Sequence, residues 1–346
     1  MIAKIRQRLP TASPLRGRLL DRVILWSGIL LVVSVVAFGA YYYVDQESKN
    51  SPPSNDEVMQ RQLTLFEQAV IEDPNNITNR LALADTYLSL ERFADAVAQY
   101  EAALVINDQS TLGHVGLGRA QLGTGDLAGA TENFQKIIDK SKEADISGEL
   151  VESAHYYLGS IALQQGNPDE AIKQLTEATK LERSDSDAWY LMGKAYMQAG
   201  KPEEAVDALM QAVLFVPDFT EAYEALAEVF DEKGATAGAL YARGMAAYSK
   251  GELEDAARLL ENAVTASPTL AEAYSGLGLV RETMGQRDAA VLAYQQALHL
   301  KPDDFNAGTG LARLTQAESR TSTEEELPAN HPGAEAGDGS EREVTP

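Results

Sequence analysis

Cysteine is missing from this 346-residue sequence, and basic residues are few. Without a thiol the chain can form no disulfide, no zinc–thiolate site and no cysteine-based active site. Lysine and arginine number 29 against 52 aspartates and glutamates, which gives a formal net charge of −23. Surfaces that bind nucleic acid are basic because they neutralise phosphates. The charge balance therefore argues against a nucleic-acid partner.

Motifs that carry chemistry are missing as well. The four histidines show no metal-ligand spacing, and no HExxH pattern, nucleophile elbow or phosphate-binding loop occurs. His114 and His155 take positions that Trp189 and Tyr223 take in similar segments, which predicts packing between helices. We expect no enzymatic activity, no metal or other cofactor, and no small-molecule substrate.

One uncharged run, Val23–Val44, lies near the beginning of the sequence. Its 22 residues suffice to cross a bilayer as a helix, which takes about 20. Trp26 lies near one end and Tyr41–Tyr43 at the other, where aromatic rings prefer the membrane interface. The alternative is a cleaved signal peptide, but the run exceeds the usual h-region of about 7–15 residues. The pattern predicts an uncleaved transmembrane helix in contact with the lipid bilayer.

Charges beside this run predict its orientation. Residues 1–22 carry six bases against one acid, whereas Asp45 and Glu47 follow the run. The positive-inside rule makes the basic segment cytoplasmic and the remainder extracytoplasmic. We expect a single-pass protein of the plasma (inner) membrane, with a periplasmic repeat region if the source is bacterial. Residues 45–57 are predicted to be a linker, and the acidic residues 319–346 a disordered tail.

Between these ends the sequence repeats itself with a base period of 34 residues. Six alanines recur in similar contexts at spacings of 34, 41, 34, 51 and 34: Ala96, Ala130, Ala171, Ala205, Ala256 and Ala290. A turn residue stands five positions before each alanine and is glycine in five of the six cases. A large apolar residue stands four positions after it: Tyr100, Phe134, Leu175, Leu209, Leu260 and Tyr294.

Each unit is predicted to form two amphipathic helices joined by a tight turn, as residues 186–219 illustrate. Trp189, Gly193 and Tyr196 share one stripe of a helix. Gly200 ends this helix, because glycine is favoured just past a helix C-terminus. The small Gly193 lets the two backbones approach closely.

This pattern resembles the tetratricopeptide-repeat signature W-x₂-L-G-x₂-Y…A-x₃-F…P. Six full units match it: 77–110, 111–144, 152–185, 186–219, 237–270 and 271–304. Residues 58–76 resemble the second helix of a partial unit, and residues 305–318 resemble a capping helix. The resemblance implies an all-α, right-handed solenoid of helix-turn-helix repeats that binds proteins. In this chain the solenoid is preceded by the predicted transmembrane helix.

Two spacings depart from the period. Seven extra residues within Ser141–Val151 predict a longer connection between two units. Seventeen extra residues equal half a repeat: residues 220–234 have a first-helix pattern and are followed directly by another one. One second helix is therefore missing or altered. Because stacking needs alternating helices, we expect a bend or break that separates a lobe at 58–233 from a lobe at 234–318.

The resemblance also implies where a partner binds. In this family the first helices line a concave groove, and its residues lie one, five and eight positions after the packed aromatic. The candidate groove residues are Arg119, Tyr156, Tyr190, Lys194, Met197, Glu224, Glu228, Asp231, Tyr241, Met245 and Tyr248. Aromatic and methionine side chains suit apolar segments, and the acids suit a basic one. Packing against a neighbouring repeat is the alternative for each residue.

Three functions fit these patterns. The first is a membrane-tethered scaffold or assembly factor that holds a protein or peptide segment in the groove. The second is chaperone-like capture of exported unfolded chains, as in membrane-anchored repeat components of cytochrome c maturation or of the translocon periphery. The third is a non-catalytic regulatory subunit of an envelope enzyme. The groove lacks the Lys and Asn arrangement with which co-chaperone repeats clamp a C-terminal carboxylate, so that mode is not expected.

Overall fold

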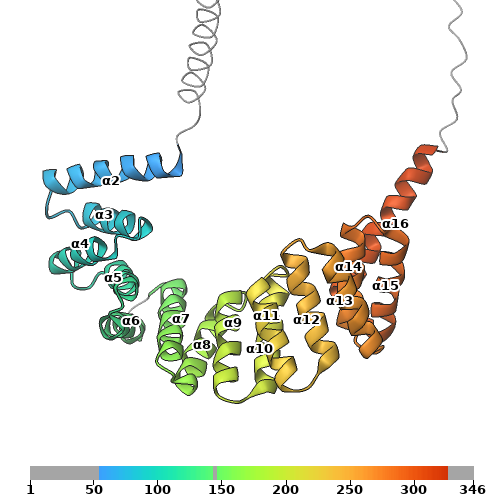
Figure 1. Ribbon diagram of the computed structural model, residues 1–346. Helices are drawn as coiled ribbons and strands as arrows, with labels where there is room; N and C mark the ends of the chain where they lie inside the picture. The colour runs from blue at the N-terminus through green and yellow to red at the C-terminus, as the bar shows by residue number, and fades with distance from the viewer. Residues whose placement is uncertain (1–53, 143–145, 326–346) are drawn as a thin grey trace, which may run out of the picture. The chain divides into compact units, whose positions relative to one another are not determined.

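A computed structural model describes residues 54–142 and 146–325, which form fifteen helices and no strand (Figure 1). The chain divides into two compact units, Met1–Pro74 and Asn75–Pro346. The predicted membrane span 23–44 lies outside the described residues, as do the basic segment before it and most of the linker. None of the described helices combines the length and the apolar character that a bilayer span requires.

Helix α2 (Asn55–Glu72) forms the described part of the first unit. The Ser54 hydroxyl caps it by accepting a 3.3 Å hydrogen bond from the Glu57 amide, as serine commonly does at a helix N-terminus. The helix begins three residues before the predicted start at 58, so the end of the predicted linker is helical.

Helices of the second unit follow the predicted units closely (Figure 1). They are α3 (Ile77–Ser89), α4 (Phe93–Ile106), α5 (Thr111–Thr124), α6 (Leu127–Ser141), α7 (Gly148–Gln164), α8 (Pro168–Leu181), α9 (Ser186–Gln198), α10 (Pro202–Phe215), α11 (Thr220–Glu232), α12 (Thr236–Ser249), α13 (Leu253–Ala266), α14 (Ala271–Thr283), α15 (Arg287–Leu300) and α16 (Phe305–Glu325). The predicted all-α solenoid is confirmed. Helix α16 runs beyond residue 318 to Glu325, so the first residues of the predicted disordered tail are helical, and residues 326–346 lie outside the described residues.

Close approach within a pair depends on small residues of the first helix. A Cβ atom added at Gly193 would lie 2.5 Å from the Leu209 side chain, which is fully buried. A Cβ atom added at Gly159 would lie 2.5 Å from the Leu175 side chain, and one added at Gly118 would lie 2.7 Å from the Phe134 ring. Such distances leave no room for a methyl group, so glycine permits the spacing at which the large residue fills the interface.

The seven-residue insertion is accommodated partly by helix. Helix α7 has 17 residues, whereas the other first helices α3, α5, α9, α11 and α14 have 13 or 14. The additional residues Gly148–Val151 form an extra turn at its beginning. The predicted longer connection therefore shrinks to residues 142–147, of which 143–145 lie outside the described residues.

The half-repeat spacing arises because α12 takes part in two repeats. It packs against both α11 and α13. Ala239 follows the turn glycine Gly234 by five residues, as in a second helix, and is buried. Gly244 lies against Leu260 of α13, as the glycine of a first helix does. A Cβ atom added at Gly244 would lie 2.7 Å from the Leu260 side chain. Helix α12, called the shared helix below, is the second helix of α11 and the first helix of α13.

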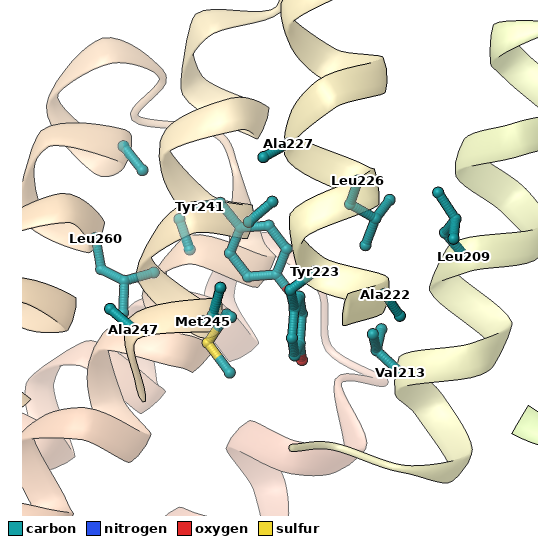
Figure 2. Packing of buried hydrophobic residues seen from close by; sticks show 14 of the residues in the cluster. Leu209, Val213, Ala222, Tyr223, Leu226, Ala227, Tyr241, Met245, Ala247 and Leu260 are labelled. Atoms are coloured by element: carbon teal, nitrogen blue, oxygen red, sulfur yellow. The ribbon is translucent and has the colours of Figure 1, made fainter. Parts of the chain in front are cut away.

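One buried cluster runs through the shared helix (Figure 2). It joins Leu209 of α10 and Leu226 of α11 to Met245 of α12 and Leu260 of α13. The Tyr223 and Tyr241 rings meet edge to face, with 6.3 Å between their centroids. The division of the repeats into two lobes near residue 234 stays a prediction, but hydrophobic packing is continuous across that point.

The turn residue Glu91 can be used to test whether the turn between the two helices of a repeat requires a positive φ. It has φ +55°, and it is the one non-glycine residue with positive φ in the described chain. The corresponding Gly200 has φ +67°. A side chain in this conformation costs about 1 kcal/mol. We expect Glu91→Gly to raise the free energy of unfolding by about 0.5–1 kcal/mol. Gly200→Ala should lower it by about 1 kcal/mol, measured by urea denaturation followed by circular dichroism. Equal stability of Glu91→Gly and the wild type would contradict strain at this turn.

Candidate functional site

First helices form the inner layer of the repeat unit. Neighbouring first helices contact one another from α3 through α5, α7 and α9 to α11, and again from α12 through α14 to α16. Second helices α4, α6, α8 and α10 make no such contacts with each other. The stack is therefore closer on the first-helix side, which is the side on which the candidate groove residues were predicted.

A cavity of about 260 Å³ lies between α9 and α11 and is called the central cavity here. It is lined by Tyr190, Lys194, Met197, Gln198, Glu221, Glu224, Ala225 and Glu228. Five of these lining residues were predicted for the groove: Tyr190, Lys194, Met197, Glu224 and Glu228. They come from two first helices that start 34 residues apart in the sequence. The Lys194 ammonium lies 5.4 Å from the centroid of the Tyr190 ring, within cation–π range. Phe219, which the sequence did not single out, supports the same ring at 5.2 Å.

The surroundings of the central cavity are acidic. Lys194 is the only base among its lining residues, against the carboxylates of Glu221, Glu224 and Glu228. Burial raises the pKa of Asp187, and the neighbouring carboxylates of Asp185 and Glu221 raise it further. The part of this rise in pKa that comes from the two carboxylates reflects the negative charge gathered there. This part of the inner layer therefore favours a cationic ligand.

Tyr156 on α7 lies next to this acidic region. Burial raises the pKa of its phenol to about 12, and the carboxylates of Asp187 and Asp185 add to the effect. Its ring meets the Tyr157 ring edge to face at 5.2 Å. The side chain is half-buried against the hydrophobic cluster of α7 to α10. Tyr156 is thus positioned as the neighbour of the central cavity on the preceding first helix.

A second cavity of about 410 Å³ lies further toward the N-terminal end of the repeat unit. It is lined by Leu81, Asp85, Leu88, Ser89, Tyr100, Leu112, Val115, Gly116, Arg119, Glu149, Leu150, Ser153 and Tyr157. Arg119 is the one predicted groove residue in it. The Tyr100 hydroxyl donates a hydrogen bond to Asp85, which holds one acidic side of the cavity in place. Leu112 is 61% exposed, so the cavity offers apolar surface to a partner.

Two of the three predicted acids on α11 pair with the shared helix. Glu224 lies 2.7 Å from the ammonium of Lys250, and Asp231 pairs with Arg243. The two acids are seven positions apart in the sequence, and so are the two bases. The earlier acid pairs with the later base, so the two ion pairs join α11 to an antiparallel α12. Exposed pairs of this kind contribute at most about 1 kcal/mol. Glu228 lies between them and lines the central cavity, with no ion pair recorded for it in the described residues.

The three candidates on the shared helix are placed differently from the prediction. Tyr241 and Met245 are buried in the cluster of Figure 2, because α12 also serves as a second helix to α11. They form core instead of groove surface. Tyr248 is half-buried, and its hydroxyl lies 3.4 Å from the Thr283 hydroxyl of α14. It links two first helices of the inner layer.

His114 serves as a packing residue in its repeat and is 6% exposed. His114 Nε2 lies 3.0 Å from the carbonyl oxygen of Asp108, six residues earlier. Trp189 Nε1 donates to the Arg183 carbonyl, also six residues earlier, at 2.9 Å. The two rings therefore make the same hydrogen bond at the same repeat position. No cluster of three or more potential metal ligands occurs in the part of the chain that the structure describes.

Glu152 is a half-buried residue of α7. One of its oxygens, Oε1, is enclosed without a hydrogen-bond partner among the described residues. Burial raises the pKa of Glu152 to about 7, helped by a hydrogen bond to the Asp185 carboxylate and by the charge of Glu182. Asp185 caps α9 by accepting hydrogen bonds from the amides of Asp187 and Ala188. The pair connects α7 to the start of α9.

Comparison with known proteins identifies the family. Models of the tetratricopeptide repeat match residues 81–145, 162–229, 216–271 and 271–304. The matches cover most of the described helices, and the packing above is that of stacked helical hairpins. The chain is a tetratricopeptide-repeat protein.

Individual relatives are more distant. Over 117 residues the chain is 32% identical to heat shock protein STI1 of Saccharomyces cerevisiae, a match that covers 33% of this chain and 19% of STI1. Yeast Tom70 is 15% identical, with a TM-score of 0.45 over 80% of this chain and 62% of Tom70. A repeat protein of Cytophaga hutchinsonii is 16% identical, with a TM-score of 0.45 over 73% of this chain and 94% of its own.

The Glu152 carboxyl generates a prediction about pH. Its pKa in the folded chain is raised above the usual 4.5 to about 7, so the folded state holds this proton more tightly than the unfolded state. The associated stability is fully present below the usual pKa and is lost as pH rises through about 7. Glu152→Gln should abolish this loss, so its stability relative to wild type should be higher at pH 8 than at pH 5. Thermal unfolding at both pH values measures this difference in stability.

Glu101→Gln, on the exposed surface of α4, is the control and should show no such difference. Equal pH dependence of Glu152→Gln and the wild type would refute the assignment.

Proposed function

We propose that this chain is a protein-interaction scaffold that holds a segment of a partner protein along its first helices. The observation that carries the proposal is the central cavity, where an aromatic ring, a methionine and three acids converge from α9 and α11. Aromatic anchors in a pocket are where binding energy concentrates, and methionine adapts its shape to different apolar groups. The ligand that fits best is a segment with an apolar side chain next to a basic one.

The parts of this surface act at different stages of binding. Tyr190 and Met197 supply the apolar contact area that slows dissociation. Glu221 and Glu228 are exposed, so they attract a basic segment during approach and mainly affect the association rate. Arg119 lies in the second cavity beside Asp85 and Glu149, where it adds a site for a polar or acidic group of the same segment. A ligand that spans both cavities has its basic end near α11.

Tethering to a membrane is part of the proposal. It rests on the uncharged run at 23–44 and on the six bases before it. The scaffold is then held at the plasma (inner) membrane, with its repeats on the extracytoplasmic side. A tether of this kind raises the local concentration of the scaffold for partners that reside in the same membrane or pass through it.

Chaperone-like capture of unfolded exported chains is the second candidate. The similarity of 117 residues to a heat shock protein favours it, although that match covers only 19% of the relative. Under this reading the partly exposed apolar residues of the inner layer bind many unfolded clients. The scaffold reading requires one defined partner in its folded complex.

The central cavity can be tested with a photoreactive amino acid in intact membranes. Placed at Gln198, which lines the cavity, it should crosslink one protein, identified by mass spectrometry. Placed at Gln135 on exposed second-helix surface, it should not. With that partner, Tyr190→Ala should weaken binding by on the order of 2 kcal/mol, because it removes a pocket anchor. Glu228→Gln should mainly lower the association rate and reduce its salt dependence.

Controls separate binding from folding. Leu181→Ala truncates an exposed apolar residue on α8, away from the cavity, and should bind like the wild type. Helicity is measured for each variant by circular dichroism. Loss of binding by Tyr190→Ala only together with loss of helicity would make Tyr190 a core residue. Crosslinks from Gln198 to many unrelated exported chains would select the chaperone reading.

Orientation in the membrane is tested by protease. Added to spheroplasts, it should degrade the repeats at 58–318 while leaving a cytoplasmic marker protein intact. The reason is that the acidic side of the predicted span is expected outside. Protection of the repeats until the cells are lysed would place them in the cytoplasm and overturn the proposed orientation.

A further inference from the structure

A cavity larger than the central one lies at the shared helix. It has a volume of about 660 Å³ and is called the junction cavity here. Its lining comes from α10, the end of α11 and the turn that follows it, the first turns of α12, the end of α13, the start of α14 and the connection between these two helices: Val206, Met210, Phe230, Gly234, Ala235, Thr236, Ala237, Gly238, Tyr241, Ala266, Ser267, Leu270 and Glu272. Eight of these thirteen residues carry an apolar or aromatic side chain, and Gly234 and Gly238 are glycines.

Its position follows from the double role of the shared helix. In a regular repeat the second helix is followed by a new first helix. Here α12 is followed by α13, which is a second helix to it, and α11 and α13 make no contact within the described unit. The beginning of α12 is therefore flanked by α10 on one side and by the α13–α14 connection on the other. The space that regular stacking fills with a helix stays open at this point.

One residue of α10 is apolar only in this repeat. Met210 stands five positions after the alanine of its second helix and lines the junction cavity. The second helices α4, α6, α8, α13 and α15 carry polar residues at that position: Glu101, Gln135, Thr176, Glu261 and Gln295. Met210 and Val206 are one turn apart on α10 and are half-buried. The surface of α10 beside the cavity is therefore apolar at a position that is polar in other repeats, as binding of an apolar ligand requires.

Charged residues of both signs border this apolar surface. Glu272 lines the cavity and pairs with Lys301 at 3.4 Å. Glu203 and Asp207 are exposed residues of α10 close to Val206 in the sequence. Lys233 pairs with Glu203 at 3.1 Å. In a chain with a net charge of −23, a ligand of positive charge is favoured at this rim over one of negative charge.

We infer that the junction cavity docks an amphipathic helix of a partner protein that carries basic residues beside its apolar stripe. The helical form follows from the open position, which stacked helices occupy elsewhere in the unit. The apolar stripe follows from Met210, Val206 and Phe230, and the basic residues follow from the net negative charge of the chain. This site shares no lining residue with the central cavity on α9 and α11.

The test uses the full-length chain and two synthetic helical peptides. Both peptides carry the same leucine and alanine stripe; one is flanked by lysines and the other by glutamates. Because the chain has no cysteine, Thr236→Cys provides a single attachment point at the cavity for a photocrosslinker. Lys194→Cys provides the same at the central cavity. The basic peptide should crosslink at position 236 and bind at least tenfold more tightly than the acidic one at low salt.

A matched pair of variants on α10 completes the test. Met210→Gln introduces a residue type that Gln135 and Gln295 already provide at this repeat position, so folding is expected to be kept. It should weaken binding of the basic peptide at least tenfold. Leu214→Gln, one turn further on the same helix and 58% exposed, lies outside the cavity lining and should change binding less than twofold. Circular dichroism confirms that both variants are folded.

Three results would overturn the inference. The first is equal binding of the basic peptide by Met210→Gln and Leu214→Gln. The second is crosslinking at position 194 instead of 236, which would move the peptide to the groove. The third is self-association of the wild-type chain in sedimentation that Met210→Gln abolishes, which would make a second copy the occupant.

Discussion

In five of the repeats, a glycine of the first helix lies against a large side chain of the second, from Gly118 with Phe134 to Gly278 with Tyr294. This contact sets the distance between the two helices, because a methyl group has no room there. The large residue is then enclosed completely, and each hairpin presents a uniform surface to the next. The inner layer of first helices, and hence both of its cavities, depends on that regular spacing.

The shared helix α12 makes the contacts of a first helix on one side and of a second helix on the other. Gly244 makes the first-helix contact with Leu260, while Ala239 occupies the second-helix position beside α11. Two sides of α12 are therefore buried, which removes Tyr241 and Met245 from the groove. At the same time the open space beside its first turns becomes the junction cavity. Loss of groove surface and gain of a new cavity have the same cause.

Much of this architecture could be predicted from the sequence, because the 34-residue period fixes which residues face a partner helix. The helix bounds and the meeting of Tyr190 and Lys194 with Glu228 follow from it directly. The double role of α12 was missed, although its signal was present: Gly234 and Ala239 repeat the spacing of Gly200 and Ala205. The ion pairs of Glu224 and Asp231 could not be predicted, since they depend on which side of α12 faces α11. The membrane span stays a prediction that the described residues do not test.

Repeat arrays open and close largely through contacts between neighbours, so each hairpin of a regular array can fray nearly independently of distant ones. A helix that belongs to two hairpins removes that freedom. Opening α13 exposes one side of α12 and opening α11 exposes the other, so we expect the three helices to unfold locally together. Amide hydrogens of α11, α12 and α13 are accordingly expected to exchange as one group. The cooperative blocks of this chain therefore do not coincide with the 34-residue units of its sequence.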